Sequence, residues 1–386
     1  MSRRIHLSKP DIGVREERAV MGALRSGWAA PAGPMVDRFE AEVALRTGVA
    51  GALALSSGTA ALHLALLDVG ARAGRLVVVP SMTFAASANA VVYTGAEPVF
   101  VDADPRDGNV DPALLIHAVD TLRAEGHDVC AVMTVDLFGR VVDYAGIVPA
   151  LSERGIPLVE DAAEALGAHR GGQAAGSFGR AAALSFNGNK ILTTSGGGML
   201  LSDDLELLAR ARHLSAQARD PAPWYEHTEI GYNYRLSNVL AALGVAQLSR
   251  LDDMIARRRG VRDVYAAHLR GLPGVQILGR QPGMDDSGDN HWLTCLLLPH
   301  GVSPEDFVAD LDDRDIEARH LWKPMHLQPV HAARRAFVTG GSERLFRTGV
   351  ALPSGSGLTD DEVMRVVEAV LESVTHRLRS GAPIHA

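Results

Sequence analysis

Three short segments place small, acidic and basic side chains at the predicted ends of strands. Ser57-Gly58-Thr59 joins a predicted strand to a predicted helix, where free backbone N–H groups attract phosphate. Asp161 ends another predicted strand, and Lys190 lies in a turn of small and polar residues. Taken singly, each has a simpler interpretation, namely a helix cap, a capping carboxylate or a solvated lysine.

Together these segments supply what pyridoxal phosphate (PLP) requires from a protein. A lysine forms a Schiff base with this cofactor, a carboxylate keeps its pyridine nitrogen protonated, and a helix N-terminus with hydroxyl groups binds its phosphate. Phe84 follows the second predicted strand, where its ring could stack on the cofactor. Glu160 and Asp161 should point to opposite faces of their strand, which disfavours a metal pair.

The elements that must position these residues alternate between Ala52 and Asp204. Apolar runs predict strands at Leu53–Leu55, Leu76–Val79, Pro98–Val101, Val129–Val135, Pro157–Val159, Ala181–Phe186 and Gly198–Leu201. Helices are predicted between them at Ala60–Leu67, Thr83–Tyr93, Pro112–Glu125 and Asp143–Arg154. This alternation predicts a mostly parallel sheet with helices on both faces. Ligands of such sheets bind beyond the carboxyl ends of the strands, so the three segments should meet at one edge.

The pattern changes after Ser237, which is expected to cap a long helix reaching about Leu269 and broken or bent near Gly260. A smaller α+β domain should follow, with a surface loop at Gln281–Asp289, strands at Asn290–Leu298 and Ile316–Ala318, and helices at Ser303–Asp312 and Thr359–Leu378. We therefore predict a large domain over residues 1–250, including the N-terminal segment, and a small one over residues 251–386.

Composition excludes several classes of protein. The chain has 386 residues, 47% of them hydrophobic, with 38 Lys plus Arg against 46 Asp plus Glu and a net charge of −8. This balance argues against broad binding to nucleic acid or anionic membranes. Two cysteines, Cys130 and Cys295, make no disulfide framework, and no apolar run approaches the ~20 residues of a membrane span. Without a secretory signal, the expected location is the cytoplasm.

Six segments in order resemble the DegT/StrS family of PLP-dependent sugar aminotransferases. They are Ser57–Leu64 (SGTAALHL), Thr83–Asp102, Glu160–Gly167 (EDAAEALG), Ser185–Gly198 (SFNGNKILTTSGGG), Gly231–Gln247 (GYNYRLSNVLAALGVAQ) and Arg319–Pro329 (RHLWKPMHLQP). The resemblance implies an α/β, type I aminotransferase fold, with a large, mostly parallel seven-stranded sheet and a smaller C-terminal α+β domain. It also implies a homodimer whose active sites are shared between subunits.

The resemblance assigns roles residue by residue. Lys190 matches the Schiff-base lysine, Asp161 the partner of the pyridine nitrogen, and Phe84 the stacking aromatic. The remaining matches are cofactor contacts, with phosphate contacts at Gly58, Thr59 and Ser185, a position near the cofactor at Glu164, and a phosphate ligand from the other subunit at Asn233. A branch that dehydrates its substrate has histidine in place of the lysine, so Lys190 favours transamination.

The substrate is inferred from two segments. Ser185–Gly198 and Trp322–His326 resemble the branch that aminates UDP-4-keto-6-deoxy-N-acetylhexosamines, as in bacillosamine biosynthesis, with L-glutamate as the expected donor. Substrate contacts are predicted at Asn187, Arg319, Lys323 and His326. Relatives that act on dTDP-4-keto-6-deoxyhexoses share most of these residues, so that substrate stays an alternative. The nucleotide, the stereochemistry, the pathway and any oligomer beyond a dimer are left open.

Three other interpretations compete with this one. The spacing of His320, His326 and His331, which prolines interrupt, argues against a metal site. A nicotinamide dehydrogenase is disfavoured because no G-x-G-x-x-G opens a helix after the first strand. A non-catalytic binding or regulatory protein on the same fold is the remaining alternative, against which the intact pair of Lys190 and Asp161 argues.

Overall fold

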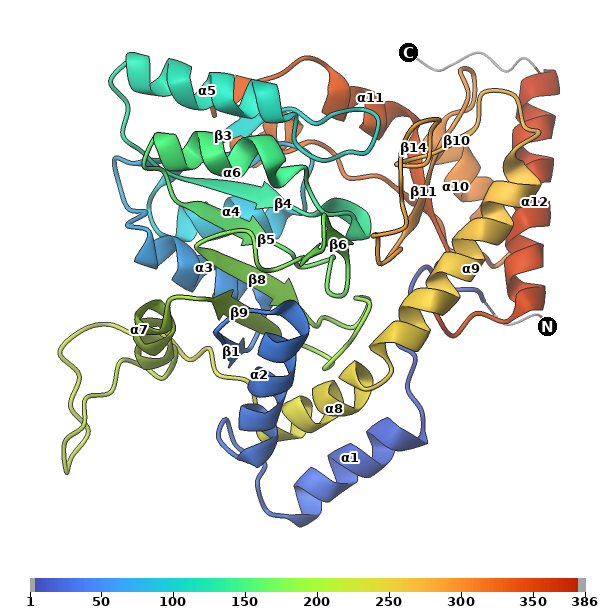
Figure 1. The fold of residues 1–386 in the computed structure, drawn as a ribbon. Helices are drawn as coiled ribbons and strands as arrows, with labels where there is room; N and C mark the ends of the chain where they lie inside the picture. The colour runs from blue at the N-terminus through green and yellow to red at the C-terminus, as the bar shows by residue number, and fades with distance from the viewer. Residues whose placement is uncertain (1–3, 381–386) are drawn as a thin grey trace.

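All seven strands expected between Leu53 and Leu201 are present in the computed structural model, which describes residues 4–380. They form one sheet with an eighth strand, β13, in the order β1-β9-β8-β5-β4-β2-β3-β13 (Figure 1). The strands are β1 (Gly51–Leu55), β2 (Leu76–Pro80), β3 (Glu97–Val101), β4 (Val129–Val135), β5 (Leu158–Asp161), β8 (Ala181–Ser185), β9 (Gly198–Ser202) and β13 (Ala336–Phe337). Only β9 runs antiparallel to its neighbours in this sheet.

Helices cover both faces of the sheet, as parallel strands with apolar side chains on both faces require. One face packs against α3 (Gly58–Asp68), α4 (Ala85–Tyr93) and α7 (Leu205–Ser215). The other packs against α2 (Pro34–Thr47), α5 (Pro112–Ala124) and α6 (Tyr144–Glu153). The type I aminotransferase architecture expected from the sequence is thus observed.

The long helix after Ser237 is broken at a different place from the one predicted. It consists of α8 (Asn238–Leu248) and α9 (Leu251–Leu269), and Gly260 lies inside α9. Ser237 caps α8 as expected, because its Oγ accepts from the N–H of Leu240. A helical glycine costs only about 1 kcal/mol relative to alanine, which α9 tolerates. The break lies next to Arg250, whose guanidinium is held 2.9 Å from Glu16 and 3.0 Å from Asp11, in and before α1 (Val14–Arg25).

The C-terminal part builds a second, antiparallel sheet in the order β10-β11-β14-β12. Its strands are β10 (Gln276–Ile277), β11 (Thr294–Leu297), β12 (Arg319–His320) and β14 (Gly349–Leu352). It packs with α9, α10 (Pro304–Asp312) and α12 (Asp360–Ser380), all on the right of Figure 1. The strand predicted at Ile316–Ala318 is wrong, since Ile316 makes a single bridge to Ile5 and pairing with β14 begins at Arg319.

Each of the two parts of the molecule contributes a short segment of chain to the other. β13, from the C-terminal half, pairs with β3 of the large sheet, while Ile5 pairs with Ile316. The smaller elements are β6 (His169–Arg170), β7 (Gln173–Ala174) and α11 (Gly341–Thr348). The domain boundary at residue 250 stays a prediction. Within residues 4–380, no helix combines the length and apolar character needed to cross a bilayer.

Candidate active site

A cavity of about 920 Å³ opens at the carboxyl ends of the central strands, where the sequence predicted the site. Most of the predicted site residues line it: Gly58, Thr59, Phe84, Asp161, Glu164, Ser185, Asn187, Lys190 and Arg319. Such a volume lies in the range of small-molecule sites, ~300–1,000 Å³.

The first turn of α3 forms one wall of the cavity and is shaped for a phosphate. Ser57 caps the helix by accepting from the N–H of Ala60 at 3.0 Å, and the N–H groups of the first turn lack helical partners. Gly58 allows the close approach of β8, because a Cβ there would lie 3.1 Å from Ser185 Cβ and 3.2 Å from Leu184 O. This cradle of backbone N–H groups and hydroxyls fits a phosphate ester.

Asp161 ends β5 with its carboxylate buried beside the cavity. Its Oδ2 accepts from Ser87 Oγ at 2.7 Å and its Oδ1 from the N–H of Ala163 at 3.2 Å. Burial raises the pKa of Asp161, against the lowering effect of these hydrogen bonds and of Lys190. A buried carboxylate of this kind needs a cationic partner, and the protonated pyridine nitrogen of PLP fits that need. Ser87, on α4, was missed by the sequence analysis.

Lys190 lies in the turn after β8, with only 11% of its side chain exposed. Its Nζ is 3.2 Å from Glu164 Oε1 and 4.2 Å from the centre of the Trp292 ring. Glu164 is fixed from its other side, since its Oε2 accepts from the N–H of Phe138 at 2.8 Å. Burial raises the pKa of Glu164, and the charge of Lys190 opposes that rise. Trp292, at the end of a polar loop, was also missed.

Aromatic side chains form another wall of the cavity. Phe84 is 57% exposed at the start of α4, and its ring centre lies 5.7 Å from that of Trp322. Trp322 in turn lies 5.1 Å from Phe138. The exposed ring of Phe84 leaves a flat apolar face toward the cavity, on which a planar cofactor ring can stack.

Three predicted residues lie apart from this wall. Asn233 forms a bridge with Ala216 in the segment between α7 and α8, and Lys323 is exposed. His326 is largely buried, and its Nδ1 is 2.6 Å from Ser81 Oγ. Among the lining residues between 4 and 380, none of these three is found, so their ligand contacts stay predictions. In the same described part of the chain, no group of three or more His, Cys, Asp or Glu side chains could hold a metal ion.

The N-terminal segment contributes residues that the sequence analysis did not single out. His6, Ser8 and Lys9 line the cavity, and Ser8 Oγ donates to Asn189 O at 2.8 Å, next to Lys190. Polar residues before a first helix carry no pattern of their own. Contacts with distant segments bring them to the site, namely the bridge of Ile5 to Ile316 and the hydrogen bonds of Leu7 with Glu317 and Ser354.

A loop lysine, a buried strand-end carboxylate and a phosphate cradle, on this fold, define a PLP-dependent aminotransferase. A sequence profile of the DegT/DnrJ/EryC1/StrS aminotransferase family matches residues 10–371, and the chain belongs to this family.

Individual relatives match the chain over nearly its whole length. EpsN of Bacillus subtilis (strain 168), provisionally named a pyridoxal phosphate-dependent aminotransferase, is 45% identical over 96% of this chain and 96% of its own. The GDP-perosamine synthase of Caulobacter vibrioides is 37% identical over 95% of this chain and 97% of its own. The crystal structure of DesI in the presence of its TDP-sugar product is 30% identical, covers 98% of this chain and 95% of its own, and has a TM-score of 0.87.

Proposed function

We propose that the protein transfers an amino group from L-glutamate to the 4-keto group of a nucleotide-linked 4-keto-6-deoxy sugar, namely a UDP-4-keto-6-deoxy-N-acetylhexosamine. The observation that carries this proposal is the contact of Lys190 with Glu164 beside Asp161, in a cavity large enough for a cofactor ring and a sugar. The names of two relatives, GDP-perosamine synthase and DesI with a TDP-sugar, support a nucleotide sugar as acceptor. The choice of UDP is supported by the segments Ser185–Gly198 and Trp322–His326 alone.

PLP, when bound, supplies an electron sink that makes the proton next to an amino group removable. Lys190 Nζ is the group that moves such a proton, because among residues 4–380 the one other amine that lines the cavity, that of Lys9, belongs to an exposed residue. Glu164 Oε1, at 3.2 Å, holds the resulting ammonium in place between proton transfers. Asp161 holds the pyridine nitrogen protonated, and Phe84, whose ring centre lies 5.7 Å from that of Trp322, stacks on the cofactor ring.

The substrate side of the cavity has cationic groups for a diphosphate. Arg319 and Lys9 both line the cavity. The side chain of Arg319 is 68% exposed, and its guanidinium forms an ion pair with Glu317 at 2.8 Å. Charge-assisted hydrogen bonds from such groups to phosphate are strong, and bidentate ones from arginine are directional. In our proposal Asn187 contacts the sugar, and Lys323 and His326, which do not line the cavity of their own chain, also contact the substrate.

A homodimer with shared active sites is part of this proposal. Trp224, Tyr225 and Ile230 are 64%, 79% and 88% exposed on the extended segment between α7 and α8, at the left of Figure 1. Large apolar side chains exposed together favour a protein contact. Asn233 follows directly after them, so a partner subunit that covered this segment would receive Asn233 near its own cofactor site.

A single-turnover comparison tests the proposal. The protein is charged with pyridoxamine phosphate and mixed in parallel with UDP-4-keto-6-deoxy-N-acetylglucosamine, the dTDP-linked 4-keto-6-deoxyglucose and the GDP-linked 4-keto-6-deoxymannose. Fast conversion of the cofactor to its aldehyde form with the UDP sugar alone is expected. Conversion with the dTDP or GDP sugar only would overturn the choice of nucleotide. No conversion with any of them would overturn the proposed reaction.

A further inference from the structure

Asn290 is a fully buried amide that joins three segments of chain. Its Nδ2 donates to Glu164 O at 2.7 Å and to Leu166 O at 3.0 Å, and its Oδ1 accepts from the N–H of Trp292 at 2.9 Å. Its own backbone N–H donates to Gly139 O at 3.0 Å. Both amide hydrogens are therefore used, and an aspartate of the same shape could not make these donations.

The segments that Asn290 joins are those that surround the ammonium group of Lys190. Glu164 pairs with Lys190 Nζ at 3.2 Å, and Trp292 presents its ring at 4.2 Å. Trp292 Nε1 also donates to Asn189 O at 2.7 Å, which ties the residue before Lys190 to the same cluster. Asn290 touches neither Lys190 nor the cavity, but it holds the backbone of both residues that do.

The chain around Asn290 is held in unusual backbone conformations. Phe138 has φ of 54° and His291 has φ of 56°, both in the left-handed region that non-glycine residues seldom adopt. Gly139, with φ of 93°, is indispensable there, since a Cβ would lie 1.9 Å from Asn290 Oδ1. Such conformations persist only where surrounding contacts fix them, and they concentrate at functional sites.

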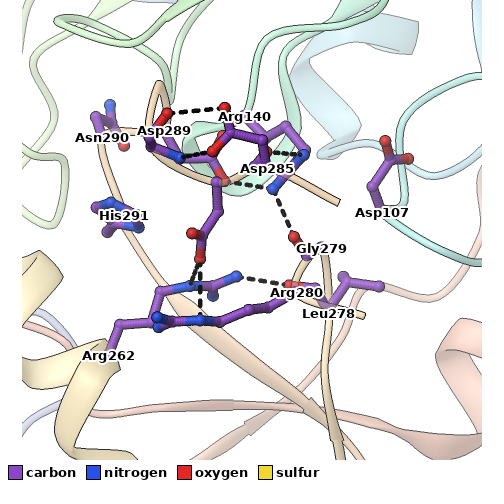
Figure 2. Close-up of polar contacts among 12 residues, drawn as sticks. Asp107, Arg140, Arg262, Leu278, Gly279, Arg280, Asp285, Asp289, Asn290 and His291 are labelled. Carbon is purple, nitrogen blue, oxygen red and sulfur yellow. Dashed lines mark hydrogen bonds and ion pairs between the residues drawn. The ribbon is translucent and has the colours of Figure 1, made fainter. Parts of the chain in front are cut away.

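Arg140 anchors the loop that carries Asn290. Its guanidinium donates to Gly279 O at 2.6 Å and to Asp285 O at 3.1 Å, and pairs with Asp289 at 2.9 Å (Figure 2). Below it in the same view, Arg262 of α9 donates to Leu278 O and pairs with Asp286 at 3.0 Å. The loop is thus fastened to the segment after β4 and to α9, immediately before Asn290.

We propose that Asn290 is a positioning residue for Lys190, which acts by fixing Glu164 and Trp292 on two sides of its ammonium group. The proposal rests on the proposed function, which makes Lys190 the catalytic amine. The contacts between Asn290, Glu164 and Trp292 do not depend on which sugar is the substrate. It predicts that losing the amide of Asn290 releases Lys190 without removing any group that contacts it.

Chemical labelling of the cofactor-free protein tests this role, because the chain has only the three lysines Lys9, Lys190 and Lys323. Limiting acetic anhydride is applied, and acetylation of Lys190 is measured by mass spectrometry relative to exposed Lys323. In N290A this ratio should rise about threefold to fivefold, because a loosened Glu164 weakens its ion pair with Lys190 without removing it. N290D, which keeps the volume of the side chain, should show a rise of the same direction.

Asn238 provides a matched control. It is also fully buried, and its amide accepts from the N–H of Met35 at 2.8 Å and donates to Trp28 O at 2.8 Å, at the start of α8. N238A should lower the melting temperature about as much as N290A while leaving the labelling ratio of Lys190 unchanged.

An unchanged ratio in a folded N290A or N290D protein would overturn the proposal, and so would an equal rise in N238A. If N290A does not fold, N290D decides by the same criterion. The labelling uses neither sugar nor cofactor, so its result would stand even if the proposed amino transfer failed. In the same way, a failed labelling test would leave the proposed amino transfer standing.

Discussion

Asp161→Asn should weaken cofactor binding while leaving the cofactor-free fold intact or more stable. The buried carboxylate is the charge that a protonated pyridine nitrogen would meet, and a hydrogen bond between charged groups contributes about 1.5–3 kcal/mol. Taking about 2 kcal/mol, the dissociation constant of PLP should rise about 30-fold. The effect on the free protein has the opposite direction, because burial raises the pKa of Asp161 and so disfavours its charged form in the fold.

The asparagine fits the local hydrogen bonds. Its oxygen can accept from the N–H of Ala163, and its NH₂ group can donate to Ser87 Oγ, whose hydroxyl can turn toward Thr83 Oγ1 at 2.7 Å. Cofactor affinity is measured by equilibrium dialysis of the cofactor-free proteins, and stability by thermal unfolding.

Asp136→Asn is the matched control for this prediction. Asp136 directly follows the neighbouring strand β4 and is buried too, and burial with the adjacent Glu160 raises its pKa well above the usual range. A neutral amide should therefore replace it with little effect, and PLP affinity should stay within about twofold. Equal affinities of the wild type and Asp161→Asn, or equal losses in both variants, would refute the role assigned to Asp161.

Three further variants give distinct outcomes. Lys190→Ala should keep the fold and abolish turnover, and measurable steady-state transamination by it would contradict the mechanism. Asp102→Asn should destabilise the protein by about 3 kcal/mol in urea unfolding. One carboxylate oxygen of Asp102 accepts hydrogen bonds from the N–H groups of Thr339, Gly340 and Gly341, and the NH₂ group of an asparagine could not accept them. Burial lowers the pKa of His291 to about 4, so the unfolded chain binds the additional proton between pH 6.5 and 4 and stability falls as the pH drops through that range. This loss should reach about 2 kcal/mol at pH 5, and His291→Asn, which tolerates the positive φ, should remove it; an unchanged pH dependence in that variant would refute the assignment.

The strands of the large sheet could be predicted because each is a short apolar run bounded by small or turn residues. In the run Leu76–Val79 the three valines are buried, and their β-branched side chains with the following Pro80 favour a strand over a helix. The same logic placed Ser57, Asp161 and Lys190 at one edge, since parallel strands end together.

The sequence could not predict contacts between residues that are far apart along the chain. β13 and β12 have only two residues each, too short for any periodicity, and the helix break at Arg250 depends on partners more than 200 positions away. Trp292 lines the cavity, and Asn290 lies behind it, in a loop that Arg140 holds and that Asn290 bonds to Glu164. A buried asparagine in a polar loop looks like any solvated one until its partners are known.

The central claim, that Lys190 carries the cofactor and releases it to an amino donor, can be tested on the three lysines of the chain. PLP-loaded protein is reduced with borohydride, with and without prior incubation with L-glutamate, and its peptides are mapped by mass spectrometry. The account predicts the cofactor mass on Lys190 alone, and its loss after incubation with glutamate. A tag on Lys9 or Lys323, or one on Lys190 that glutamate does not diminish, would contradict it.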